Sequence, residues 1–313
     1  MLRHLSFRLN RVPSINIHRK RLISENISGF LFILPSFIGF AVFFLYPVVF
    51  SLILSFCKWN LSPGFGKIKF VGLQNYTAIL SDQWFTDSMK NSLIFTVSTV
   101  VVGVALSLVI ATILSRMVFF KNAIKVMFFV PYISSAVALA IVWMIILQPT
   151  FGPVNQLLRS IGIENPPNWL ADVHWALPAL IAMYIWQNIG YNVVVYMAGL
   201  SSIPPDLYEA AEIDGANAFK KFTTITIPMV SPTTFFLTIM GIINSFKVFD
   251  QVQVLTQGGP GTSTTTMALY IYRQAFKFYK MGPASAAAWV MFILIFIVTL
   301  VQFRGQKKWV NYD

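Results

Sequence analysis

Long apolar runs separated by short polar segments dominate this chain. Each run is close to the roughly 20 residues that a helix needs to cross the hydrocarbon core of a bilayer. We therefore expect an all-α membrane protein with six transmembrane helices. Their predicted ranges are residues 27–56, 92–114, 126–147, 175–200, 229–249 and 284–303.

The polar segments divide the chain into four parts. Residues 1–28 form a basic cytoplasmic tail, and 29–90 hold the first span and an outer segment, which carries a turn at Pro63–Gly66 and an amphipathic helix at 73–84. Residues 91–303 form a five-helix transport core with a polar loop at 201–228, and 304–313 form a second cytoplasmic tail. A signal peptide is the alternative for the N-terminus. Against it, the first apolar run is too long and lacks a small-residue cleavage site.

Composition supports a multi-pass membrane protein. Of 313 residues, 56% are hydrophobic and 11% charged, and the mean hydropathy is +0.68. The net charge of +12 fits retention of basic residues on the cytoplasmic side better than nucleic-acid binding. With both termini in the cytoplasm, 14 Lys and Arg lie inside and nine outside. We therefore expect both termini on the cytoplasmic side of the membrane.

Catalytic and metal-binding patterns are absent from the sequence. His4, His18 and His174 are scattered, and the single cysteine, Cys57, excludes an internal disulfide. Gly64–Lys67 lacks the spacing of a phosphate-binding loop. The sequence therefore predicts neither an enzyme nor a chain that binds metal, ATP or another cofactor.

The predicted spans also lack Asp and Glu in their cores. Ion-coupled carriers usually keep ionisable groups there. A secondary transporter or channel working without an ATPase is therefore less favoured, but it stays open because backbone carbonyls can also bind cations.

An acidic segment lies between the fourth and fifth spans. Asp206, Glu209, Glu212 and Asp214 are four of the chain's 11 acids. The preceding Pro204–Pro205 favours a helix start, and Gly215 permits a left-handed exit. A short acidic helix here favours docking of a soluble partner, and an ordinary cytoplasmic loop is the alternative.

A family resemblance rests on this segment. Glu209-Ala210-Ala211, Gly215 and Ile225-x-Ile227-Pro228 resemble the EAA motif of permease subunits of bacterial ABC importers, with Ile227 in place of the usual leucine. The string from Tyr208 to Ala216 is similar to the carbohydrate branch, which includes maltose, multiple-sugar and glycerol-phosphate permeases. The resemblance implies a type I importer (MetI-like) fold in the inner membrane of a bacterium. It also implies coupling to an ATPase subunit through Tyr208, Glu209, Ala210, Ala211, Asp214, Gly215 and Ala216.

The same resemblance implies partners and a cargo. We expect a second, homologous permease in a heterodimer, two copies of an ATP-binding subunit that carries ATP and Mg, and an extracytoplasmic sugar-binding protein. The expected activity is import of a sugar, a di- or oligosaccharide. The alternative cargo is glycerol phosphate or another polar solute, to which Lys247 could point.

Polar and aromatic residues of spans four and five suit a sugar, because amides pair with hydroxyl groups and rings cover C–H faces. Hydrogen bonding between membrane helices is the alternative role for them. Alignment with the maltose-importer permease of the family implies a substrate pathway along Tyr184, Asn188, Tyr191, Gly241, Asn244, Ser245 and Val248.

The loop expected at 250–283 carries Gly258-Gly259-Pro260. A simple surface turn would explain it. The resemblance instead implies that these three residues contact the binding protein.

Overall fold

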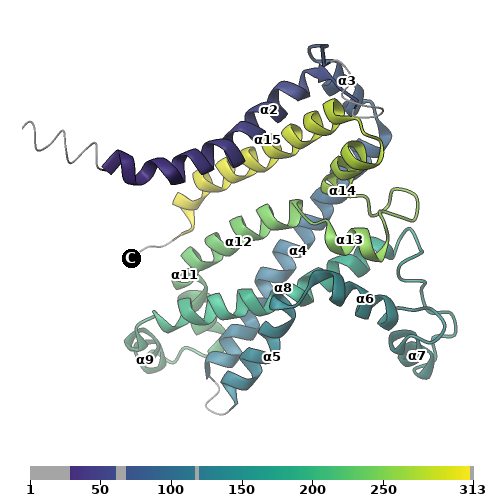
Figure 1. The fold of residues 1–313 in the computed structure, drawn as a ribbon. Helices are drawn as coiled ribbons and strands as arrows, with labels where there is room; N and C mark the ends of the chain where they lie inside the picture. The colour runs from purple at the N-terminus through teal and green to yellow at the C-terminus, as the bar shows by residue number, and fades with distance from the viewer. Residues whose placement is uncertain (1–28, 61–67, 117–119, 311–313) are drawn as a thin grey trace, which may run out of the picture. The chain divides into compact units, whose positions relative to one another are not determined.

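The computed structural model describes residues 29–60, 68–116 and 120–310 (Figure 1). The predicted N-terminal tail 1–28 and the predicted turn Pro63–Gly66 lie outside these residues. The chain divides into two compact units, Met1–Ile53 and Leu54–Asp313, and each is described by itself.

The described part of the first unit is a single helix. The helix begins at Gly29, runs on to Ser55, and includes the π-helical turn η1 (Ala41–Leu45) and α2 (Tyr46–Ser55). The π turn lies just before Pro47, whose missing N–H and bulky ring disturb a regular helix. Apolar side chains are exposed along its length, such as Phe32 at 88%. A helix that is apolar on all sides suits a membrane environment.

The second unit is organised around α4 (Gln83–Arg116). This helix has 34 residues and is roughly 50 Å long. It packs against α8 (Ala176–Ser201) and α12 (Ser231–Phe246). The predicted start at residue 92 was too late, because the Asp82 carboxylate caps the helix by accepting from Trp84 N–H at 2.9 Å. The first turns of α4 are polar because they form hydrogen bonds with the segment around Thr262.

The third predicted span is broken. Residues 126–147 were expected as one helix, but α5 (Lys121–Ile133) and α6 (Ala136–Ile146) meet at 101°. Pro131 removes a backbone donor near the end of α5, and Ser134 takes an extended conformation with ψ 153°. The break lets α5 pack on α8 while α6 packs on α13 (Asp250–Leu255).

All six predicted runs are helical in the described residues, although not all are equally apolar. Length and composition single out four helices that could cross a membrane, and five if the bent pair α5–α6 is one span. The four are residues 29–55, 83–115, 231–255 and 281–308, the last comprising α15 (Met281–Gly305) and the 3₁₀ turn η4 (Gln306–Lys308). The fourth predicted run is α8, which has 26 residues but also carries Gln187, Asn188 and Asn192.

One end of the second unit is built from short elements. Strands β1 (Cys57–Lys58) and β2 (Lys69–Phe70) pair antiparallel, and α3 (Gln74–Leu80) packs on α15. Helix α7 (Pro153–Ser160) lies between α6 and α8 in the chain. The long loop predicted at 250–283 is mostly helical instead, with α13, α14 (Met267–Tyr272) and the π turn η3 (Arg273–Lys277).

Polar contacts hold this region against the start of α4. Asn91 donates to the carbonyls of Thr262 and Thr265, and Tyr270 donates to Asp82 at 2.7 Å. Because these contacts satisfy buried polar groups, the segment packs rather than remaining an open loop.

Candidate functional site

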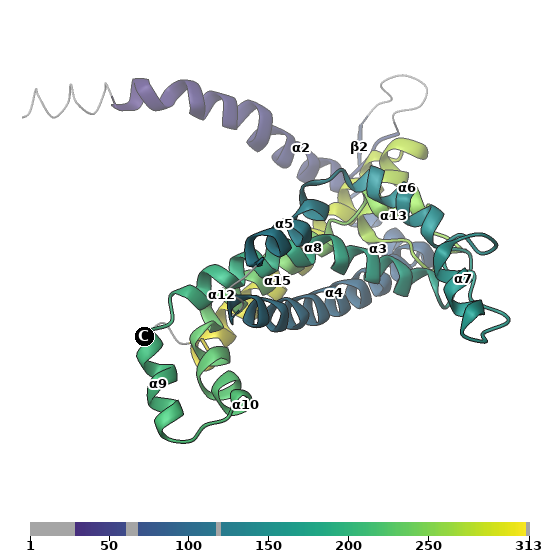
Figure 2. The same cartoon turned by 90° about the horizontal axis from the view of Figure 1, so that it is seen from below.

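The acidic segment forms α9 (Pro205–Ile213), which projects with α10 (Ala218–Lys221) beyond the ends of α4, α8 and α12 in Figure 2. Pro205 occupies the first turn, where its missing N–H costs no hydrogen bond. At the other end Gly215 has φ +74°, and Ala216 N–H donates to the Ala211 carbonyl at 2.8 Å. These features form a Schellman motif, which confirms the predicted left-handed exit at Gly215.

One face of α9 is open to solvent. Glu209 and Ala210 are exposed, and Ile213 is 88% exposed. Leu207, at 41%, and Phe219 of α10, at 74%, add further exposed apolar surface. A large aliphatic side chain at this level of exposure on a projecting helix is a feature of protein interaction sites. Ile213 was absent from the predicted coupling residues, although its place four residues after Glu209 puts both on one helix face.

The opposite face of α9 is fastened to the membrane helices. The hydroxyls of Tyr208 and Thr226 are hydrogen-bonded at 3.0 Å, and Thr226 is 1% exposed. Lys221 pairs with Glu212 at 2.6 Å. Thr226 ends the π turn η2 (Phe222–Thr226), which leads through α11 (Ile227–Met229) into α12. A movement of α9 therefore has a direct path to α12.

A hollow of about 530 Å³ lies between α9 and the ends of α4 and α8. Its walls include Thr112 and Ser115 of α4 and Leu200 of α8, together with Tyr208 and Thr226. Both partners of the hydrogen bond between Tyr208 and Thr226 therefore line this hollow.

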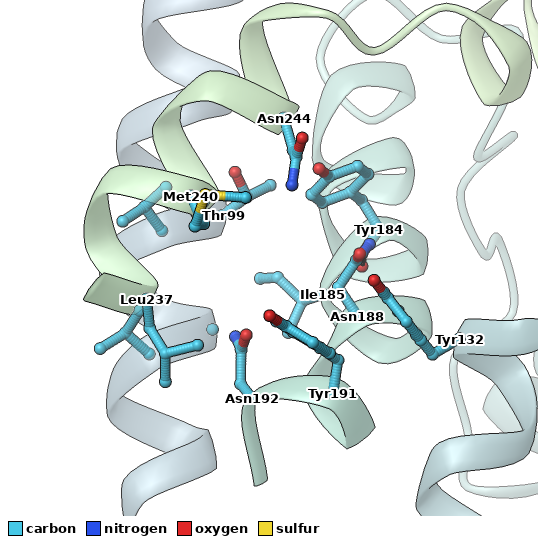
Figure 3. Close-up of a pocket in the computed structure, with 14 residues that line it drawn as sticks. Thr99, Tyr132, Tyr184, Ile185, Asn188, Tyr191, Asn192, Leu237, Met240 and Asn244 are labelled. Carbon is cyan, nitrogen blue, oxygen red and sulfur yellow. Dashed lines mark hydrogen bonds between the residues drawn. The ribbon is translucent and has the colours of Figure 1, made fainter. Parts of the chain in front are cut away.

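A second site is a small polar cavity between α4, α5, α8 and α12. Its volume is about 40 Å³, which leaves room for a few water molecules. Figure 3 shows Asn244 and Tyr184 at one end of the cavity and Asn192 and Tyr191 at the other. Hydroxyl and amide groups from several helices therefore line one space.

Aromatic contacts shape the cavity. The rings of Tyr132 and Tyr191 stack with centroids 4.8 Å apart, and Tyr184 meets Phe95 edge to face at 5.1 Å. The Asn188 amide donates to the Tyr184 carbonyl at 2.8 Å. Its carboxamide oxygen accepts no hydrogen bond from the described residues, so it can accept from a ligand hydroxyl.

Five of the seven residues predicted for the substrate pathway line this cavity: Tyr184, Asn188, Tyr191, Gly241 and Asn244. Ser245 and Val248 lie elsewhere. Ser245 is fully buried and donates to Thr96 of α4 at 2.9 Å, while Val248 is 5% exposed within an apolar cluster. Both are packed as structural residues in this conformation.

The cavity also contains residues that the sequence-based pathway did not include: Thr99, Gly103, Tyr132 and Asn192. Tyr132 comes from the last turn of α5, immediately before the break with α6. No periodic pattern marks a broken helix, so the sequence offered no signal that this ring would face α8.

Gly190 controls how closely α5 approaches α8. A Cβ atom on Gly190 would lie 1.8 Å from the Phe128 carbonyl oxygen and 2.9 Å from Cα of Phe129. Only a residue without a side chain allows these backbones to touch. Because Tyr132 is one turn from Phe128, this contact also sets the width of the cavity.

The predicted Gly-Gly-Pro contact loop is a fixed structure. Gly258 has φ +81° and is buried, whereas Gly259 and Pro260 are half-buried. Thr265 donates to the Gly258 carbonyl at 2.9 Å, and Thr264 to that of Gly259 at 2.7 Å. Gly258 is therefore a buried residue of the loop, held by its hydrogen bond with Thr265.

Comparisons with known proteins give a consistent result. Residues 103–309 match the model of the family described as binding-protein-dependent transport system inner membrane component. The arabinooligosaccharides transport system permease protein AraP of Bacillus subtilis is 34% identical over 289 residues, covering 91% of this chain and 90% of that protein. The lactose transport system permease protein LacF of Rhizobium radiobacter is 35% identical, covering 90% of this chain and 95% of its own.

A third relative has a different named cargo. The sn-glycerol-3-phosphate transport system permease protein UgpA of Agrobacterium fabrum is 33% identical, and the match covers 92% of this chain and 97% of that protein. A chain in the crystal structure of a bacterial ABC transporter involved in the import of the acidic polysaccharide alginate superposes with a TM-score of 0.81 at 24% identity. The match covers 94% of this chain and all of that one, so the two share a fold.

Proposed function

Because this chain belongs to the family of binding-protein-dependent transport system inner membrane components, and is thus an ABC importer permease subunit, we propose that its cargo is a neutral sugar. We propose a di- or oligosaccharide. A binding protein outside would deliver it, and ATP hydrolysis on a separate subunit would drive its passage.

The observation that carries this proposal is the chemistry of the polar cavity. Its 14 lining residues include three tyrosines and three asparagines but no charged side chain. Amides and phenols can both donate to and accept from sugar hydroxyls. A phosphate group would instead favour arginine or lysine in the wall. The cavity therefore favours the sugars named for AraP and LacF over the glycerol phosphate named for UgpA.

The size of the cavity supports a shared pathway. A space of about 40 Å³ is too small for a sugar ring. We infer that this chain supplies one wall and that a second, related permease supplies the other. A heterodimer with two ATP-binding subunits that hold ATP and Mg would then provide one ATPase for each α9.

The exposed face of α9 supports docking of the ATP-binding subunit. Ile213 and Glu209 would enter the interface, while Tyr208 and Thr226 on the other side would pass the movement to α12. This arrangement favours an ATP-driven importer over a secondary transporter or channel, because neither needs a docking helix. We further propose that α9 and both chain termini lie in the cytoplasm, where the ATP-binding subunit would find ATP.

The first experiment is purification of the tagged chain in mild detergent with identification of its partners, followed by uptake assays in proteoliposomes with ATP inside. We expect a second permease and an ATP-binding subunit, and uptake of a neutral sugar supplied with the cognate binding protein. Uptake of glycerol phosphate but no sugar would contradict the proposed sugar cargo. A chain that purifies alone and transports solute without ATP would contradict the proposal of an ATP-driven importer.

Asn188→Leu tests the cavity, because it keeps the volume of the side chain and removes its amide. We expect at least about a tenfold loss of sugar uptake, corresponding to one or two hydrogen bonds. Ser98→Ala on α4, which lies outside the cavity lining, is the matched control and should transport normally.

A further inference from the structure

Three lysines lie in or beside the small sheet at the end of the second unit away from α9. Lys58 is directly opposite Lys69 in the β1–β2 pair, and Asn60 forms an antiparallel bridge with Lys280. Directly paired residues share a face, and so do residues two apart on a strand. Lys58 and Lys69 therefore share a face of the sheet. Asn60 lies two residues after Lys58, just beyond β1, and its isolated bridge brings the backbone of Lys280 alongside. We call Lys58, Lys69, Lys280 and Asn60 the lysine face.

Burial supports this geometry. The three lysines and Asn60 are all exposed, whereas Cys57, on the alternate face of β1, is 4% exposed. The sheet has firm support beneath. The Asn75 amide donates to the carbonyls of Ser55 and Cys57 at 2.8 and 2.9 Å, and a Cβ on Gly282 would meet the Cys57 carbonyl oxygen at 2.2 Å.

The lysine face has no compensating charge within the described residues. None of its three lysines forms an ion pair with a described carboxylate, and the ion pair between Lys221 and Glu212 lies beside α9. Like charges directly opposite each other in a sheet are unfavourable. A fixed scaffold that places three exposed lysines at neighbouring backbone positions is therefore suited to an anion.

The surroundings place that anion at the membrane surface. Lys280 directly precedes α15, one of the helices apolar enough to cross the bilayer. Next to it, Phe276, Phe278 and Tyr279 are 61%, 48% and 46% exposed. Phe70 of β2, which pairs with Cys57 on the other face of the sheet, is 74% exposed. Exposed aromatic rings beside lysines at the end of a span are typical of the level of the lipid headgroups.

We propose that the lysine face binds the phosphate groups of anionic phospholipids and so fixes the depth of α15 in the bilayer. The proposal rests on α15 crossing the membrane and is independent of the transported solute. The phosphates lie at the headgroup level, where the aromatic rings reach the acyl boundary while the ammonium groups stay in the polar layer.

The test measures lipid binding by the purified importer complex. Thermal unfolding in detergent is followed while phosphatidylglycerol, or phosphatidylcholine as the zwitterionic comparison, is titrated in. We expect phosphatidylglycerol to stabilise the native complex more strongly. The triple variant Lys58→Gln/Lys69→Gln/Lys280→Gln should bind it at least about tenfold more weakly. The matched triple arginine variant should retain the effect, and Lys307→Gln/Lys308→Gln at the far end of α15 should retain most of it.

Three results would overturn the proposal. One is an unchanged preference for phosphatidylglycerol in the glutamine triple variant. A second is an equal effect of both lipids on the wild-type complex. The third is loss of binding-protein affinity in the glutamine variant with lipid binding intact, which would make the lysine face a protein-docking surface. If the triple variant unfolds before titration, Lys280→Gln alone gives the same comparison. A complex that shows lysine-dependent lipid binding but imports no sugar would contradict the proposed function alone.

Discussion

The hydrogen bond between Tyr208 and Thr226 joins α9 to η2, the segment that leads through α11 into α12. Helix α12 is one of the helices that line the cavity. We predict that Tyr208→Phe weakens coupling, because it removes the hydroxyl and keeps the packing of the ring. A hydrogen bond of this kind contributes about 1 kcal/mol. Uptake per ATP hydrolysed should fall several-fold, while the complex stays assembled.

Thr226→Val is the matched partner variant, since it removes the other hydroxyl of the same pair at nearly constant volume. If the hydrogen bond is what matters, the double variant should be no worse than either single variant. Fully additive losses would show that the two residues act separately.

Gly190 offers a test of helix spacing. In Gly190→Ala the new methyl group would overlap the Phe128 carbonyl, so α5 must move away from α8. We expect destabilisation of about 1–3 kcal/mol, measured as a lower midpoint of thermal unfolding, together with reduced sugar uptake.

Gly103→Ala is the control for this variant. Gly103 lines the cavity, whereas Gly190 lies at the α5–α8 contact, and a Cβ on Gly103 would meet no atom within 4 Å. Its unfolding midpoint should match that of the wild type. Equal damage from both substitutions would show that an added methyl at either glycine is harmful and would remove the special role of the α5–α8 contact.

At the scale of elements, α9 presents an apolar residue where the fold gains nothing from it. Ile213 is 88% exposed, so Ile213→Ser should leave thermal stability of the chain unchanged. We expect it to lower recovery of the ATP-binding subunit in affinity purification, because the aliphatic contact with the partner is lost. Ile213→Leu should keep it, and full recovery with serine would place the docking contact elsewhere.

The sequence predicted elements well where a local rule governs them. Proline at the first turn and glycine at a left-handed exit define α9, and apolar length identifies the membrane helices. The break between α5 and α6 was missed, because Pro131 and two serines inside an apolar run do not distinguish a tolerated kink from a 101° bend. Tertiary contacts decide that outcome.

The same limit applies to the candidate site. The family resemblance implied Tyr184, Asn188 and Asn244, but Tyr132 reaches the cavity only because α5 ends there. The packed region 250–272 was expected as an outer loop, since its partners Asp82, Asp87 and Asn91 lie more than 150 residues earlier in the sequence.

For the whole molecule, the most informative prediction is the orientation of the chain across the membrane. In a Cys57→Ala background, a single cysteine is placed at Ile213 in α9 or at Gln257, two residues after α13, and both positions are exposed. Helices α9 and α13 lie at opposite ends of the second unit (Figure 1). A membrane-impermeant thiol reagent should label Gln257→Cys in intact cells and Ile213→Cys only after the membrane is permeabilised. The reverse pattern would contradict the proposed topology.

Helix α4 links these two ends without interruption. Its first turns are bound to the segment that holds Thr262 and Tyr270, and its last turns form a wall of the hollow under α9. It contains no proline across 34 residues, so no missing backbone donor interrupts its hydrogen bonds. Such a helix moves as one rigid body, so a tilt imposed at one end displaces the other end at the same moment. Opening on one side of the membrane and closing on the other would then be a single rigid-body movement, with no intermediate in which both sides are open.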